Sequence, residues 1–362
     1  MNSIVKLSIA ISGLYLWDSG RPQVYHILIL VFMIICLMKD TRILVTKDYL
    51  LALLFPAYIL IMQVLTFFVY GIENFQSVLY YIFNFSFFVC FVNYYSDRGK
   101  KIAEMSDYLI LAALISLMSV YLGVDVDKGY SRPTGGFNNP NQLGYFGLIM
   151  LNLSTLYLVR FDQKNRALIL FLISIMLIIT SLSKAALVAA LPAILLFTYL
   201  GKSYWKLAFY GVGIPALIVS VFYLYAYVSD VGYENIRLFA RLANIGADSD
   251  DNFGGRGYLF LLNPDLRVIF GVGEGVYNLE HGKEPHTSIG NIITNWGLIG
   301  GLLFLGVMTN MFRGFFQGGY KIVVLAMLLS MFLYSLTHNG LRFTPFWLLL
   351  AIYYSSINGP KK

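Results

Sequence analysis

Apolar runs close to the roughly 20 residues that cross a bilayer recur along the whole chain. They lie at 3–17, 24–38, 49–70, 75–95, 106–123, 143–159, 167–181, 185–200, 205–228, 287–312, 322–337 and 343–357. Hydrophobic residues make up 58% of the 362 residues and charged residues 12%, whereas soluble domains contain about 45–50% and about 25%. We therefore expect an all-α, polytopic membrane protein with about twelve transmembrane helices, forming a single integral-membrane domain over 1–362.

One long polar stretch, 229–286, interrupts this pattern between the ninth and tenth predicted helices. Most of the 26 lysines and arginines fall in short connections on one side, and by the positive-inside rule that side, with both termini, is cytoplasmic. An even number of spans separates 229–286 from 124–142, the tip at Ser183–Lys184 and 338–342, so all four share the outer face. The net charge of +7 then reflects orientation, and no nucleic-acid partner is expected.

The loop before the sixth predicted helix reads RPTGGFNNPNQLG and begins at Arg132. Its glycines and prolines favour tight turns, and Asn141 is placed to cap the helix that follows. The loop is either a capped entry into the membrane or a site where Arg132, Asn138 and Asn141 bind phosphate or sugar hydroxyls beside a helix N-terminus.

Lys184 lies between two apolar runs, in the sequence TSLSKAA. A lysine at the end of a span is commonly a membrane anchor that reaches toward the interface. On the outer face, where lysine is disfavoured, the residue is a stronger candidate for binding an anion.

The long polar loop carries three candidate phosphate ligands. Residues 233–245 can form a short amphipathic helix with Arg237 and Arg241 on one face. That helix either lies on the membrane surface or clamps a pyrophosphate between two guanidinium groups. Arg256 follows in a GGRG turn, where glycines permit close approach of the backbone to a ligand.

Two histidines on the outer face are candidates for acid–base work. His286 ends the long loop in the sequence PHTS, and neighbouring arginines would keep its imidazole neutral, as a general base requires. His338 and Arg342 form a second pair, which either supports the same site or ends a helix at Gly340. His26 and His281 are expected to be structural.

Several kinds of chemistry have no clear signature in the chain. Cys36 and Cys90 lie inside apolar runs without redox or ligand spacing, and no cleavable signal peptide is evident. The cluster at 248–251 either attracts a divalent cation or is a solvated loop tip. The histidines show no HExxH spacing and no P-loop occurs, so neither a metal nor another cofactor is expected.

In order along the chain, RPTGGFNNPNQLG, the Ser-Lys hairpin, GGR, GVGEGVY and PHTSIGNIITNWGLIGGLLFL resemble the bacterial O-antigen polymerase and O-antigen ligase family. The resemblance extends from Arg132 to Leu305. It implies a GT-C-like glycosyltransferase of the inner (plasma) membrane, whose active site is periplasmic and whose donor is an undecaprenyl-pyrophosphate-linked oligosaccharide. His286 occupies the position of the family's essential histidine, Arg256 that of its Gly-Arg turn, and Arg241 that of the preceding basic residue.

The resemblance also implies partners and a reaction. Membrane lipid surrounds such enzymes, and a chain-length regulator and a repeat-unit flippase accompany them. The hairpin departs from the family's Ser-Arg-Gly, since Lys184 keeps the charge but lacks the two-pronged guanidinium. The expected reaction is inverting polymerisation of O-antigen, capsule or exopolysaccharide repeat units. The alternatives are ligation of finished glycan to lipid A–core and, in another class, transport of the lipid-linked glycan.

Overall fold

The computed structural model describes residues 1–17, 21–39, 47–72, 75–95, 98–123, 132–200, 256–262, 265–282, 284–313 and 320–358. Every regular element within these ranges is a helix. The long helices are α2 (Val24–Lys39), α3 (Lys47–Tyr70), α4 (Phe75–Tyr95), α6 (Ser106–Tyr121), α7 (Pro140–Phe161), α8 (Lys164–Ser181), α9 (Lys184–Leu200), α15 (Ser288–Arg313), α16 (Lys321–Ser335) and α17 (Thr344–Asn358). The short ones are α1 (Asn2–Ala10), α5 (Gly99–Ala103), η4 (Tyr258–Leu262), α13 (Leu266–Phe270) and α14 (Val276–His281).

Length and composition of these helices identify a multi-pass membrane protein. Six stretches of the described chain are long and apolar enough to cross a bilayer, namely Leu53–Tyr70, Phe75–Tyr95, Gly99–Tyr121, Pro140–Phe161, Lys164–Ser181 and Ser288–Asn310. Three shorter apolar helices accompany them, Val24–Lys39, Lys184–Leu200 and Lys321–Ser335. The predicted all-α membrane class is thereby confirmed. The predicted span 205–228 lies outside the described residues.

The first predicted span, 3–17, is wrong as a single helix. α1 ends at Ala10 after nine residues, which rise only about 13 Å. Gly13 then packs directly on Ser116 of α6, and the N–H of Tyr15 donates to the carbonyl of Gly136 at 2.9 Å. Residues 11–13 form turns and residues 14–16 are irregular, and this stretch supports the loop before α7 in place of further helix.

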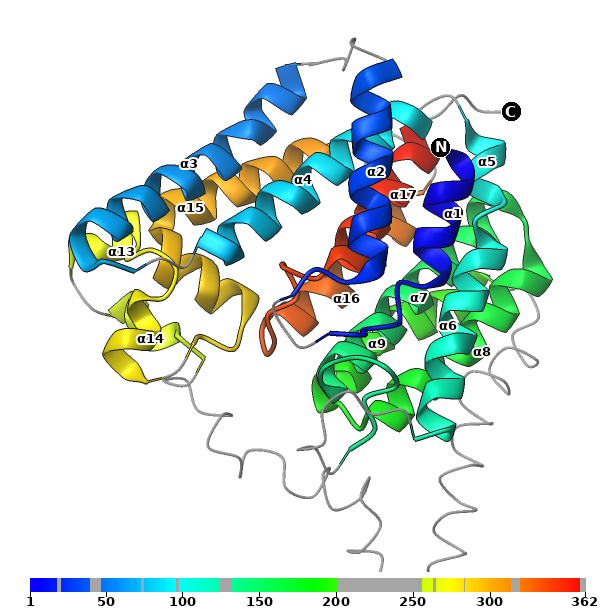
Figure 1. Ribbon diagram of the computed structural model, residues 1–362. Helices are drawn as coiled ribbons and strands as arrows, with labels where there is room; N and C mark the ends of the chain where they lie inside the picture. The colour runs from blue at the N-terminus through cyan, green and yellow to red at the C-terminus, as the bar shows by residue number, and fades with distance from the viewer. Residues whose placement is uncertain are drawn as a thin grey trace, which may run out of the picture.

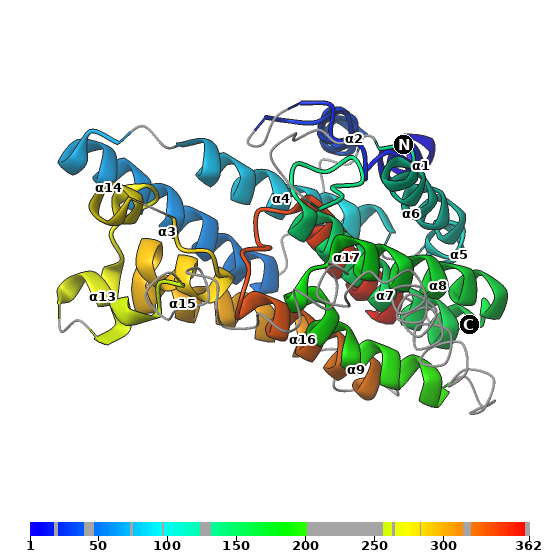
Figure 2. The same ribbon diagram turned by 90° about the horizontal axis from the view of Figure 1, so that it is seen from below.

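The helices form two side-by-side groups with α2, α4 and α17 between them. Figures 1 and 2 show α3, α15, α13 and α14 on one side and α6, α7, α8 and α9 on the other. α7 packs against α8, α9, α16 and α17 and is buried along most of its length. α7 is thus the central helix of the second group.

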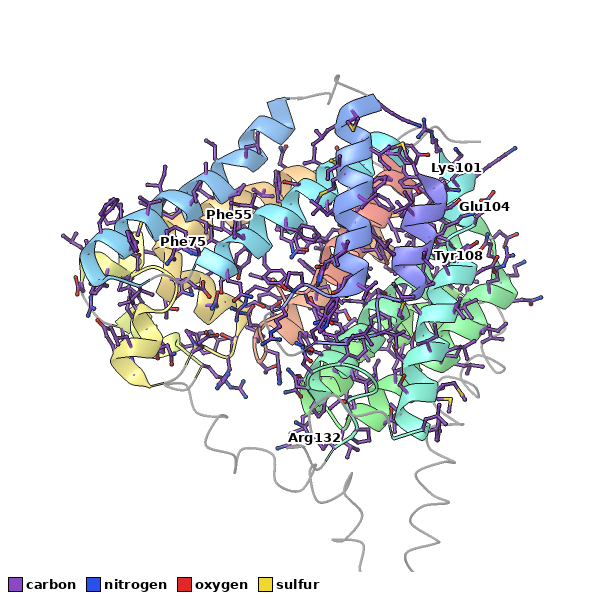
Figure 3. The ribbon with its side chains drawn as sticks, viewed as in Figure 1. Phe55, Phe75, Lys101, Glu104, Tyr108 and Arg132 are labelled. Carbon is purple, nitrogen blue, oxygen red and sulfur yellow. The ribbon has the colours of Figure 1, made fainter. Side chains whose placement is uncertain are left out.

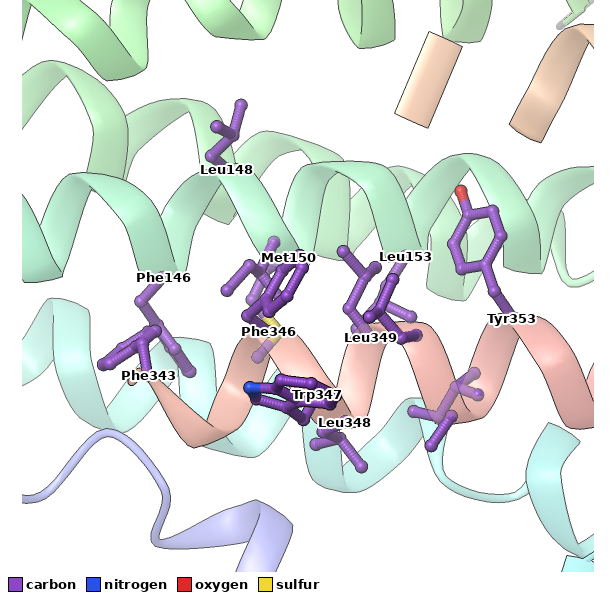
Figure 4. Close-up of a cluster of buried hydrophobic side chains, with 14 of the residues drawn as sticks. Phe146, Leu148, Met150, Leu153, Phe343, Phe346, Trp347, Leu348, Leu349 and Tyr353 are labelled. Atoms are coloured by element: carbon purple, nitrogen blue, oxygen red, sulfur yellow. The ribbon is translucent and has the colours of Figure 1, made fainter. Parts of the chain in front are cut away.

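Close packing around α7 relies on small and aromatic side chains. Gly144 and Gly147 let α8 approach, since a β-carbon on either would press against Ser181 or Ile178. Helices in lipid associate mainly by van der Waals packing, which small residues improve. On another face of α7, side chains of and beside α17 pack on Phe146, Met150 and Leu153, as Figure 4 shows; they are Phe343, Phe346, Leu349 and Tyr353.

Hydrogen bonds and ion pairs define two opposite ends of the bundle. At the terminal end, the Tyr95 hydroxyl donates to Asn2 Oδ1 at 2.9 Å, and Arg160 Nε donates to the Ser356 carbonyl at 2.7 Å. At the loop end lie the segments 132–139, 182–184, 256–258, 274–282, 284–288 and 336–343. Figure 3 shows Arg132 far from Lys101 and Glu104, which lie at the terminal end.

The N-cap of α7 lies two residues before the one predicted from the sequence. Its N-cap is Asn139, whose side-chain oxygen accepts from the N–H of Gln142 at 2.9 Å, and Pro140 occupies the first helical position. The prediction that Asn141 caps the helix is therefore wrong. Proline is well suited to the first helical position because it lacks the N–H that would otherwise need a partner there. Since Pro140 occupies that position, the N-cap is the residue before it, Asn139.

Candidate functional site

The start of α15 contacts two loop segments that are far from it in the sequence. Thr287 Oγ1 donates to the carbonyl of Arg256 at 3.0 Å. The N–H and the hydroxyl of Ser288 both approach the carbonyl of His338 at 3.1 Å, and the N–H of Gly340 donates to Ser288 Oγ at 3.0 Å. Through these backbone contacts, the residues next to His286 hold both the Arg256 and the His338 segments.

Two glycines make this junction possible. Gly290 lies against the carbonyl of Arg256, and a β-carbon there would overlap that oxygen. Gly257 has a φ of +79° and lies against Pro285 and Gly290. The glycines of the GGRG turn were predicted to admit a ligand. In the structure, Gly257 lies against the first turn of α15, and the carbonyl of Arg256 accepts from Thr287; Gly254 and Gly255 lie outside the described residues.

The side chains at the junction differ in exposure. His286 is exposed and Arg256 is half-buried. Thr287, which follows His286 and donates to the carbonyl of Arg256, is fully buried. The ring of His338 stacks on Tyr334 with 5.3 Å between the ring centroids. An exposed imidazole and a half-buried guanidinium thus belong to two segments that are hydrogen-bonded to each other, and groups of these two kinds suit general-base chemistry on a negatively charged substrate.

A second group of predicted residues is connected to the first through Tyr334. The Tyr334 hydroxyl donates to the carbonyl of Asn141 at 3.0 Å. Arg132 Nη1 approaches Asn141 Oδ1 at 3.4 Å and the carbonyl of Leu182 at 3.5 Å. Lys184, two residues after Leu182, is the first residue of α9 and is half-buried. Arg132, Asn141 and Lys184 therefore lie together, next to the Tyr334–His338 stack.

Backbone dipoles add to the positive charge of this region. α7, α9 and α15 all begin at the loop end, at Pro140, Lys184 and Ser288. Helix N-termini carry partial positive charge and unpaired N–H groups. Together with Arg132, Lys184 and Arg256, they make the loop end suitable for an anionic group such as pyrophosphate.

Asn138 lies inside the protein, where it connects the loop to the start of α7. Its side chain is buried, and its N–H donates to Gln142 Oε1 at 3.2 Å, one turn into α7. The contact holds the loop against the helix start. Substrate binding by Asn138 would require the loop to move, whereas Arg132 and Asn141 are more accessible.

Arg342 is engaged by two carboxylates. Nη2 is 3.1 Å from Glu284 Oε2, Nη1 is 3.4 Å from Glu274 Oε1, and Nη1 also donates to Ser77 Oγ at 2.8 Å. The carboxylates raise the pKa of Arg342 despite the opposing effect of burial. These contacts favour an internal ion-pair role over the substrate binding predicted for this residue.

Glu274 is the site residue that sequence reasoning missed. It lies in the GVGEG turn, its side chain is buried, and Oε2 accepts from Asn295 Nδ2 at 2.9 Å. Its N–H donates to Gln63 Oε1 at 3.1 Å. Burial raises the pKa of this carboxyl group above its ordinary value of 4.5, and Arg342 opposes the shift. An acidic residue enclosed by glycines was the only sequence signal.

The remaining predicted residues fall into two groups. Arg237 and Arg241, the predicted phosphate clamp, lie outside the described residues, as does the acidic cluster at 248–251. Both ring nitrogens of His26 are hydrogen-bonded: Nδ1 accepts from the N–H of Gln23 at 2.8 Å, and Nε2 is 2.9 Å from Thr344 Oγ1. His281 stacks on Tyr277. In the part of the chain that the structure describes, no three His, Cys, Asp or Glu side chains are grouped as metal ligands.

No family model matches the chain, and no curated protein matches it in sequence.

Proposed function

We propose that the protein is a glycosyltransferase that joins undecaprenyl-pyrophosphate-linked oligosaccharide repeat units on the outer face of a bacterial plasma membrane. The observation that supports this most is the junction at the first turn of α15, where residues adjoining His286 hold Arg256 and His338. A candidate base and a candidate phosphate ligand thus adjoin at one end of a membrane bundle. In the proposed topology of about twelve helices in a GT-C-like arrangement, that end is periplasmic and both termini are cytoplasmic.

In the proposed reaction, a hydroxyl of the acceptor sugar attacks the anomeric carbon of the donor. His286 takes the proton from that hydroxyl as the new glycosidic bond forms. The bond from the anomeric carbon to the pyrophosphate oxygen breaks, and its electron pair leaves with undecaprenyl pyrophosphate. A single displacement inverts the anomeric configuration.

The cations of the loop end would stabilise the leaving pyrophosphate. Arg256 adjoins the base, and Lys184 and Arg132 lie together nearby, with Arg241 assigned the same role from its position in the sequence. Charge-assisted contacts to phosphate are stronger than neutral hydrogen bonds. Since the donor already carries an activated leaving group, the proposed reaction requires no nucleotide sugar and no metal.

The test is a reconstituted reaction. Purified protein in nanodiscs receives undecaprenyl-pyrophosphate repeat units from its own locus, and the products are separated on a gel. We expect a ladder spaced by one repeat unit, and we expect His286→Ala to reduce its rate by at least about 100-fold, because a general base contributes about that much. His281→Ala, which changes a histidine stacked on Tyr277, is the matched control and should leave the ladder intact.

Other outcomes would redirect the assignment. A single transfer that occurs only after lipid A–core is added would identify a ligase. Movement of the lipid-linked glycan across the bilayer without a new glycosidic bond would identify a transporter. Full activity of a folded His286→Ala variant would exclude the assigned base.

A further inference from the structure

Residues 284–288 form a short segment that is attached at both ends to one turn. At its first residue, Glu284 Oε2 is 3.1 Å from Arg342 Nη2. At its last residue, Ser288 contacts the carbonyl of His338 at 3.1 Å and the N–H of Gly340 at 3.0 Å. His286 lies midway between these attachments. The turn 338–342 therefore fixes the backbone on both sides of the candidate base.

Arg342 is itself anchored to the membrane helices. Its Nη1 donates to Ser77 Oγ of α4 at 2.8 Å, and its carbonyl accepts from Asn84 Nδ2 of the same helix at 3.2 Å. The following residues lead directly into α17, which begins at Thr344. The guanidinium is thus held in place by α4, and through its ion pair with Glu284 it fixes the start of the segment that precedes α15.

The second carboxylate, Glu274, completes the clamp. Glu274 and Glu284 flank α14, and both contact the same guanidinium, at 3.4 Å and 3.1 Å. Asn295 of α15 binds the other oxygen of Glu274 at 2.9 Å. A planar guanidinium can donate hydrogen bonds to two carboxylates in fixed directions, whereas the ammonium of a lysine cannot.

We infer that Arg342 is a positioning residue, which fixes the placement of His286 by clamping Glu284 while its own turn clamps Ser288. The inference rests on the proposed function for the role of His286 as a base. Binding of pyrophosphate by Arg342 is disfavoured because the guanidinium already lies between two carboxylates. The effect on catalysis would arise through His286, since misplacement of a reacting group by about 1 Å can cost about 100-fold in rate.

The first test measures the position of the segment and does not depend on activity. Amide hydrogen exchange is measured on the purified full-length protein, its Glu284→Gln and Arg342→Lys variants and the control Glu280→Gln. Glu280 of α14 pairs with Arg267 of α13 at 2.7 Å, so this variant leaves the contacts of Arg342 and Ser288 with the turn 338–342 unchanged. We expect exchange of 284–290 to be about tenfold faster in the first two variants, because local opening controls exchange, and unchanged in the control.

Exchange in α7 reports whether each variant is folded and should be unchanged throughout. If exchange of 284–290 in Glu284→Gln equals that of the unmodified protein, the clamp does not exist and the inference is overturned.

The second test separates positioning from substrate binding. In the repeat-unit assay, Glu284→Gln and Arg342→Lys should lower kcat about tenfold and leave the KM for the lipid-linked donor unchanged, because a positioning loss affects the chemical step. Glu280→Gln should retain full kcat. A loss confined to KM would mean that Arg342 binds substrate, and an unchanged kcat would mean that the clamp does not serve catalysis; either result overturns the inference. If the unmodified protein shows no transfer while exchange of 284–290 responds as expected, the proposed function fails and the placement of His286 by Arg342 stands.

Discussion

The two ends of the bundle use basic residues in different ways. At the terminal end, Lys6 pairs with Glu104 at 2.7 Å and Arg166 with Asp107 at 2.7 Å, and both acidic side chains are more than half exposed. At the loop end, Arg342 reaches a carboxylate that is 2% exposed. Arg342 is thus a structural connection, whereas these two pairs at the terminal end lie on the surface.

The difference follows from solvent. Water and salt screen an exposed ion pair, so its loss changes stability little. A buried carboxylate that loses its cation has no solvent to replace it, so removal of one partner is costly. Basic residues at the loop end are thus expected to affect local structure and activity, whereas those at the terminal end are expected to affect orientation in the membrane.

The sharpest contrast compares an arginine from each end. Arg256→Ala should reduce the transfer rate by about 100- to 1,000-fold, comparable to the loss of one preorganised donor in other enzymes. Arg98→Ala at the terminal end, where the guanidinium lies 4.0 Å from the centre of the Tyr94 ring, should leave the rate unchanged. Equal losses in both variants, measured in the same nanodisc assay, would remove the proposed distinction.

A second comparison uses two glycines of α15. Gly290→Ala should reduce the rate about 100-fold, because its β-carbon would displace the carbonyl of Arg256 and a misplacement of about 1 Å is sufficient for such a loss. Gly306→Ala is the matched control, since nothing lies within 4 Å of a β-carbon there. It should retain activity and gain about 0.5–1 kcal/mol in helix stability. Full activity in Gly290→Ala would show that the contact is dispensable.

The smallest expected effect is a dependence of stability on pH. Because burial raises the pKa of Glu274 above 4.5 in the folded protein, the folded state retains a proton that the unfolded chain has lost. Stability from this group is therefore present at low pH and declines as pH rises from 4.5 through the raised pKa. Thermal unfolding midpoints measured by intrinsic fluorescence should show this decline, and Glu274→Gln should flatten it.

The control for this titration is Glu280→Gln, whose exposed pair with Arg267 should leave the pH dependence as it is in the unmodified protein. A slope that persists in Glu274→Gln would assign the titration to another group.

The membrane class follows from the sequence alone. Runs of apolar residues require a nonpolar solvent whatever their neighbours, and six such runs are membrane-length helices in the structure. The candidate residues Arg132, Lys184, Arg256 and His286 were also proposed from the sequence, since polar and charged residues between apolar runs are few. Local physical rules are sufficient for the membrane class, and they are sufficient to propose the site residues.

Tertiary structure alone decided how these residues are connected. Thr287 and Arg256 are 31 residues apart, Ser288 and His338 are 50 apart, and Arg342 and Glu274 are 68 apart. Neither periodicity nor composition specifies such contacts, because they depend on how α4, α15 and α17 pack. The early end of α1 and the burial of Glu274 depend on segments brought close by distant helices, whereas the cap of α7 by Asn139 is a local effect of Pro140.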